Sequence, residues 1–140
     1  MTADDYYKVT YTLTLSIAHT LVKYNPDMTF CYISGAGTDS SEKGRSRWAR
    51  VKGKTENDLI KLPFKKVFAF RPGFIKPIKG LQHTHSYYKY INWMFPIGRK
   101  LYPSGFCTLQ ELATAMIQVA GKGYGKNIVE GDNIIKLANS

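Results

Sequence analysis

The sequence contains only two cysteines, Cys31 and Cys107, and only 10 acidic residues against 20 basic ones. The two cysteines form neither a disulfide framework nor a Cys-x-x-Cys motif, which favours a reducing, cytoplasmic compartment. The first residues are acidic where a signal peptide would be basic, and no apolar run approaches the ~18 residues of a membrane-spanning helix. We therefore expect a cytoplasmic protein that is soluble or at most peripheral.

The composition is that of a globular chain with a strong excess of positive charge. With 140 residues, of which 44% are hydrophobic, the chain can bury a core as a single domain spanning 1–140. The net charge of +10 predicts attraction to an anionic partner, such as nucleotide phosphates, nucleic acid or a lipid surface. A solvated basic face explains the same charge and remains the alternative.

The hydrophobic pattern predicts helices and strands in alternation. Capping boxes at Thr2 and Thr108 mark two helix starts. We expect helices over 4–24, 47–62, 86–95, 109–120 and from 132, and strands over 29–34, 67–71 and 127–130. This order predicts an α/β fold with a Rossmann-like parallel sheet and flanking helices.

Apolar residues at helical spacing indicate which helix faces are buried. The stripes we expect are Val9, Leu13, Ile17, Ala18 and Leu21 in the first helix; Trp48, Val51, Thr55, Leu59 and Leu62 in the second; and Leu109, Leu112, Ala113, Met116, Ile117 and Ala120 in the helix from 109. The strand 67–71 is apolar on both faces, which is typical of a buried parallel strand.

Three segments resemble the second half of the short-chain dehydrogenases/reductases: 30–35, 48–56 and 67–73. The closest resemblance is to the extended and atypical branch, with the sugar-nucleotide epimerases and the Tat-interacting oxidoreductases. It implies that the chain is the C-terminal half of a Rossmann-like fold, that NAD or NADP is the cofactor, and that 74–107 is a substrate-side insertion.

The resemblance also implies site residues. In this family one strand ends in Ser, the next helix carries Tyr-x-x-x-Lys, and the following strand ends in Arg-Pro-Gly. Lys52 matches the Lys, which holds the nicotinamide ribose and lowers the pKa of the Tyr. Arg71, Pro72 and Gly73 match the turn beside the nicotinamide. The Ser position falls on Gly35 or, one residue earlier, on Ser34.

The Tyr position of this motif is Trp48, four residues before Lys52 and therefore on the same helix face. An indole N–H is only a donor and cannot act as a general acid near neutral pH. We therefore expect weak or absent reductase activity, with Lys52, Trp48 and Ser34 as the incomplete catalytic set, and Lys52, Gly35 and 71–73 as cofactor contacts.

The glycine-rich turn of a dinucleotide site is missing from the sequence. Gly35-Ala36-Gly37 follows a strand but lacks the third glycine of Gly-x-Gly-x-x-Gly, and the glycines at 121–125 follow a helix. The chain is then either a fragment or completes its sheet with another chain. Strand 29–34 would leave an apolar edge and uncovered helix faces, which predicts a homo-oligomer or a partner chain.

Other features allow different interpretations. Six cations between Lys43 and Lys54 could hold phosphates or nucleic acid, although a solvated surface is favoured. The aromatic and basic stretch 87–102 is typical of a substrate-domain core, and an interfacial membrane helix has the same composition. His83 and His85 lack a third ligand, so no metal is expected.

The alternative function is a non-catalytic regulatory or binding module that acts through a partner chain, or a binder of an anionic surface or nucleic acid.

Overall fold

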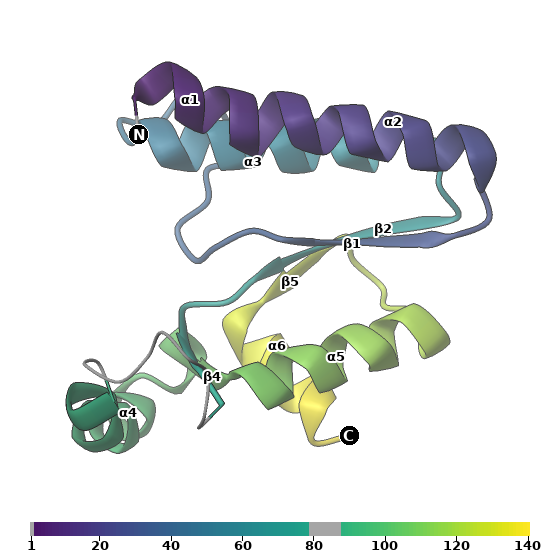
Figure 1. Cartoon of the computed structure of the whole chain (residues 1–140). Coiled ribbons are helices and arrows are strands. Elements are labelled where there is room, and N and C mark those ends of the chain that lie inside the picture. The colour runs from purple at the N-terminus through teal and green to yellow at the C-terminus, as the bar shows by residue number, and fades with distance from the viewer. Residues whose placement is uncertain (1, 79–87) are drawn as a thin grey trace.

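The fold is α/β, as expected. In the computed structural model, which describes residues 2–78 and 88–140, three parallel strands form a sheet in the order β1-β2-β5 (Figure 1). These strands are β1 (Thr29–Ile33), β2 (Lys66–Arg71) and β5 (Ile128–Glu130). Each lies within one residue of its predicted bounds, because short β-branched and aromatic runs bounded by turns specify strands well.

Helices cover both faces of this sheet (Figure 1). On one face lie α1 (Ala3–Tyr7), η1 (Lys8–Leu13), α2 (Thr14–Tyr24) and α3 (Arg47–Ile60). On the other face lie α5 (Leu109–Lys122) and α6 (Gly131–Ala138). This is the layered arrangement of part of a Rossmann-like fold, in which a parallel sheet is buried between helices.

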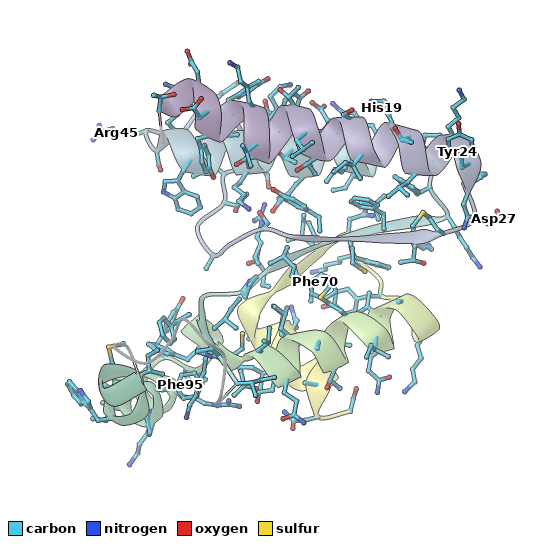
Figure 2. All side chains as sticks on the ribbon, in the orientation of Figure 1. His19, Tyr24, Asp27, Arg45, Phe70 and Phe95 are labelled. Atoms are coloured by element: carbon cyan, nitrogen blue, oxygen red, sulfur yellow. The ribbon has the colours of Figure 1, made fainter. Side chains whose placement is uncertain are left out.

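The central strand β2 divides the core in two. Val67 packs with Leu15, Ala18 and Leu59 beneath α2 and α3. On the opposite face, Phe68 and Phe70 pack with residues of α5, β5 and α6, namely Leu112, Ala115, Val119, Val129 and Ile134. Figure 2 shows Phe70 between the sheet and the α5–α6 layer. The burial of Val67 through Phe70 confirms the prediction that this strand is covered on both faces.

A second structural unit occupies the predicted insertion at 74–107. Strand β3 (Phe74–Lys76) pairs in parallel with β4 (Phe106–Thr108), and between them lie α4 (Tyr88–Leu101) and the 3₁₀ turn η2 (Pro103–Gly105). The prediction of a helix over 86–95 was too short, because α4 continues through Pro96 for another turn; residues 86 and 87 lie outside the described residues. The three-residue strands β3 and β4 were not predicted, since such short runs carry no clear alternation.

The expected inward stripe of the first helix was right only for Ala18, although the predicted extent of 4–24 was nearly right. Val9, Leu13 and Ile17 are half exposed, whereas Leu15 and Ala18 are buried. The helix is apolar on more than one side, and the side that carries Leu15 and Ala18 is the one that packs against Leu59 and Val67. The helix layer therefore presents an apolar stripe to solvent.

The predicted buried faces of α3 and α5 were right only in part. In α3, Val51, Thr55 and Leu59 are buried as expected, but Trp48 is 45% exposed. In α5 the buried side chains are Leu112, Ala115 and Val119, while Ile117 of the expected stripe is 73% exposed. Apolar residues surround much of α5, so sequence spacing alone did not identify the side that packs on α6.

Candidate functional site

A cavity of about 560 Å³ lies at the carboxyl ends of all three strands of the main sheet. In parallel α/β sheets, ligands bind in the crevice outside these strand ends. Its lining combines the loop after β1, the last residues of β2 and β5, the start of α6 and the turn η2: Ala36, Gly37, Arg71, Tyr102, Pro103, Ser104, Glu130, Gly131 and Asp132. Of the residues predicted for the site, only Arg71 contributes to this lining.

Arg71 is held by carboxylates at the end of β2. Its Nε and Nη2 donate to both oxygens of Glu56, a side chain with no exposed surface, and its Nη1 donates to Glu130 at 3.1 Å. Nη2 also donates to the hydroxyl of Ser40. A buried bidentate pair of this kind fixes the guanidinium in the cavity wall, so Arg71 positions the strand end and orients Glu130 at the same time.

Trp48 covers the loop that follows β1. A Cβ atom added at Gly35 or Gly37 would lie 3.9 or 3.6 Å from the Trp48 ring, so the indole packs against this glycine turn. Gly37 also has a φ of 83°, in the left-handed region that glycine adopts without strain. The predicted site residues Trp48 and Gly35 are therefore neighbours, and the aromatic ring fills the space above the turn.

Lys52 lies one helical turn after Trp48 and reaches the end of β1. Its Nζ donates to the carbonyl oxygen of Ile33 at 3.3 Å and lies 5.0 Å from the centre of the Tyr32 ring. The side chain is half-buried, and this burial lowers the pKa of Lys52. An ammonium carries three N–H donors, and the carbonyl of Ile33 accepts from one of them.

Tyr32 is poorly suited to the proton-transfer role that the resemblance implies for a Tyr. Burial in the sheet raises the pKa of Tyr32 to about 12. A higher pKa makes the phenol a weaker acid, which is the opposite of the change that proton transfer at neutral pH requires. The Lys52 ammonium contacts the face of this ring and makes a cation–π contact there.

Ser34 is part of the structure of the β1 loop. Its backbone N–H donates to the carbonyl of Phe70, and its buried hydroxyl lies 3.0 Å from the hydroxyl of Thr38. Thr38 in turn donates to the carbonyl of Gly35. These bonds hold the hydroxyl of Ser34 beneath the turn, so the structure assigns it a loop-stabilising contact, and a substrate contact remains only a prediction.

The turn 72–73 joins the two sheets of the fold. The carbonyl of Pro72 accepts a hydrogen bond from the N–H of Ala36, which extends the pairing of β1 and β2 past the strand ends. Any Cβ at Gly73 would overlap the backbone of Gly105, so only glycine fits against η2. Pro72 and Gly73 thus hold the cavity walls together, and their contact with a cofactor stays a prediction.

Several cavity residues escaped the sequence-based prediction. Tyr102, Ser104, Glu130 and Asp132 come from segments that are far apart in the sequence. Glu130 and Asp132 could have been found, because they flank the end of a predicted strand and carboxyl ends of parallel strands share one sheet edge. Tyr102 and Ser104 could not, since their position depends on η2 and the unpredicted strand β4.

The basic cluster of 43–54 is partly neutralised within the chain. Arg50 donates to the carbonyls of Gly44 and Arg45, Lys54 pairs with Asp58, and Arg47 lies 3.4 Å from Asp4. These contacts favour the interpretation of a surface that serves the fold. Binding of nucleic acid by this cluster stays a prediction.

The described residues contain no group of three metal-ligating side chains, and His83 and His85 lie outside them. Within the described ranges, no helix has both the length and the apolar character needed to cross a membrane.

Comparison of the chain with protein-family models and with curated proteins found no match.

Proposed function

We propose that this chain is the substrate-side part of an NAD(P)-binding protein related to the short-chain dehydrogenases/reductases and nucleotide-sugar epimerases, with little or no reductase activity. The observation that carries the proposal is the position of Lys52. Its half-buried ammonium lies at the last residue of β1 and carries three N–H donors. A ribose with two hydroxyls is a suitable acceptor for these donors.

The open side of β1 is where such a cofactor would enter. Strand β1 is at the edge of the sheet, and its only described strand partner is β2. Successive residues of a strand direct their backbone groups to opposite sides, and the N–H of Ser34 bonds to β2. The carbonyl of Ile33 therefore points to the open side, and it is there that it receives Lys52.

The cavity beside this edge suits a small polar substrate. Glu130 and Asp132 are about half exposed at the strand and helix ends, where their carboxylates can accept hydrogen bonds from hydroxyl groups. Ser104 adds a hydroxyl, and the exposed ring of Tyr102 offers an apolar face for a sugar ring. These groups support a hydroxyl-rich substrate next to the cofactor edge.

Trp48 accounts for the proposed lack of reductase chemistry. The indole rests on the glycine turn, in the place where the motif would present a phenol. Its N–H is a hydrogen-bond donor that is too weak an acid for proton transfer at neutral pH. The protein would then bind cofactor without the usual proton transfer, as a sensor or a scaffold does.

Calorimetric titration with NADH and NADPH, combined with a reductase assay, tests this proposal. We expect saturable binding of one or both cofactors and turnover close to background. Failure of both cofactors to bind at millimolar concentration would refute it. Fast turnover with a carbonyl substrate would refute the part that concerns Trp48.

The exposed apolar face of η1 and α2 supports a second part of the proposal, namely that two copies of the chain assemble. No Asp, Glu, Lys or Arg lies between Lys8 and Lys23, and this stretch exposes Val9, Leu13, Ile17 and Leu21. An antiparallel pairing of two such helices buries both stripes. It also brings the acidic start of α1 in one copy, with Asp4 and Asp5, close to Lys23 of the other. This complementarity favours a symmetric dimer.

A further inference from the structure

The helix α4 exposes a continuous apolar face. Trp93, Ile97 and Leu101 follow one another at intervals of four residues and are 62%, 51% and 79% exposed, and Met94 and Tyr102 extend the face. At about 100° per residue, Trp93, Met94, Ile97 and Leu101 fall within roughly a 100° sector of the helix. Isolated exposed apolar residues are normal on a surface, but a coherent stripe marks an interaction site.

The side of α4 that faces the protein is fixed by specific contacts. Phe95 packs against Phe74 and Phe106, with ring centres 6.4 and 5.9 Å apart, and Figure 2 shows it on the inner side of the helix. Arg99 makes a bidentate pair with Glu111 on α5. These anchors hold the helix in one rotation, so the apolar face is directed outward and cannot turn into the core.

The segment of the sequence that contains α4 is cationic, and the carboxylate that pairs with its Arg99 comes from Glu111 on α5. No Asp or Glu occurs between Asp58 and Glu111, whereas the same stretch carries nine basic residues: Lys61, Lys65, Lys66, Arg71, Lys76, Lys79, Lys89, Arg99 and Lys100. This stretch therefore holds most of the net charge of +10. Lys100 is exposed beside the apolar sector, and Lys76 lies 5.1 Å from the ring of Phe95 below it.

We propose that α4 lies in the surface of an anionic lipid bilayer, with Trp93, Ile97 and Leu101 inserted between lipids and Lys100 among the headgroups. An apolar face that includes aromatic residues and is flanked by basic residues is typical of a helix that lies in a membrane interface. Each lysine near an anionic leaflet contributes attraction, which gives the binding its charge preference.

A second copy of the chain fits this face less well. Two α4 faces brought together would place two cationic segments with no acidic residue against each other, and like charges at an interface oppose association. The uncharged stripe on α2 has no such obstacle. The charge pattern therefore separates the two apolar faces, one suited to a second copy and one to an anionic surface.

Co-sedimentation with lipid vesicles tests the proposal in the full chain. The probes are vesicles of phosphatidylcholine alone and vesicles with one third phosphatidylglycerol, at low and at high salt. Ile97→Asp is compared with Ile117→Asp, which makes the same substitution and charge change on the exposed face of α5. Circular dichroism of both variants checks that they are folded.

We expect binding to the anionic vesicles that weakens at high salt, and no comparable binding to phosphatidylcholine. Ile97→Asp should lower the partition coefficient at least about tenfold, because it removes apolar burial and adds a charge. Ile117→Asp should change it by less than about threefold, and Lys100→Gln should lower it about fivefold.

Three results would overturn the proposal: no binding of the native chain to anionic vesicles, equal binding of the two Asp variants, or equal binding to neutral and anionic lipid. A concentration-dependent dimer that Ile97→Asp abolishes would show that a second copy covers α4. In the Trp48→Phe variant, a blue shift of the remaining Trp93 emission on vesicle addition provides an independent check, since it reports transfer of this side chain out of water.

Discussion

The ammonium of Lys52 donates a hydrogen bond of 3.3 Å to the carbonyl oxygen of Ile33, the last residue of the edge strand β1. One turn earlier on the same helix, Trp48 rests on the glycine turn that follows this strand. The two side chains therefore give neighbouring parts of the sheet edge opposite character. Lys52 presents polar donors there, whereas Trp48 covers the glycine turn with an apolar ring.

Replacing Lys52 by Ala should weaken cofactor binding at least about tenfold, because it removes the charge-assisted hydrogen bond that we propose to the ribose. Lys65→Ala is the matched control, since this lysine is exposed in the loop before β2 and its side chain makes no described contact. Calorimetry with NADPH measures both affinities. Equal affinity of the two variants would remove Lys52 from the cofactor site.

The strands and helix starts of this fold could be predicted from the sequence because local signals specify them. The run Val67–Phe70 is apolar throughout, and the Thr108–Glu111 capping box forms as expected, with the backbone N–H of Glu111 donating to Thr108. Helix faces were harder to predict. The first helix is apolar on more than one side, and the sequence does not indicate that the side of Leu15 and Ala18 is the buried one.

The candidate site could be predicted only in part, because it depends on tertiary contacts. The placement of Trp48 and Lys52 one turn apart followed from helix spacing, whereas Gly35 entered the predicted site only through the family resemblance. The partners of Arg71 did not, since Glu56 and Glu130 lie 15 and 59 residues away in the chain. Likewise, the approach of Gly73 to Gly105 depends on the pairing of two very short strands.

The stability of the fold should depend on pH through Asp58. Burial acts to raise the pKa of this carboxyl, but hydrogen bonds from Lys61, Lys54 and Tyr11 lower it to about 2. A carboxyl whose pKa is lowered by folding stabilises the protein above its unfolded pKa of about 4, and this contribution disappears as the pH falls toward 2. Its size is about 2 kcal/mol.

Denaturant unfolding of Asp58→Asn against the native chain measures this contribution. The variant should be about 2 kcal/mol less stable at pH 7, with the difference shrinking between about pH 4 and pH 2. A difference that persists unchanged at pH 2 would mean that the hydrogen bonds do not depend on the charge of Asp58.

Arg71→Ala should destabilise the protein by about 3–5 kcal/mol, because it leaves the carboxylate of Glu56 buried without its partner. Lys66→Ala, on the exposed start of the same strand, is the control and should change the free energy of unfolding by less than about 0.5 kcal/mol. Chemical denaturation measures both. A loss below about 1 kcal/mol for Arg71→Ala would contradict the claim that the buried carboxylate of Glu56 depends on this guanidinium.

Leu13→Asp should convert a dimer into a monomer, because Leu13 is in the middle of the exposed stripe of η1 and α2. Ile117→Asp makes a comparable change outside this stripe and should leave the assembly intact. Analytical ultracentrifugation over a range of protein concentrations measures the oligomeric state of both variants. A native chain that remains monomeric at high micromolar concentration would contradict the proposed assembly.

The most direct test of the account is energy transfer from Trp48 to a reduced nicotinamide. In the Trp93→Phe variant, Trp48 is the sole indole, and it lies one helical turn from Lys52. Titration with NADPH and NADH at physiological salt should give saturable quenching of its emission at submillimolar cofactor, with one cofactor preferred. No saturable quenching, when Trp48 is this close to the proposed ribose contact, would contradict the claim that this sheet edge binds a dinucleotide.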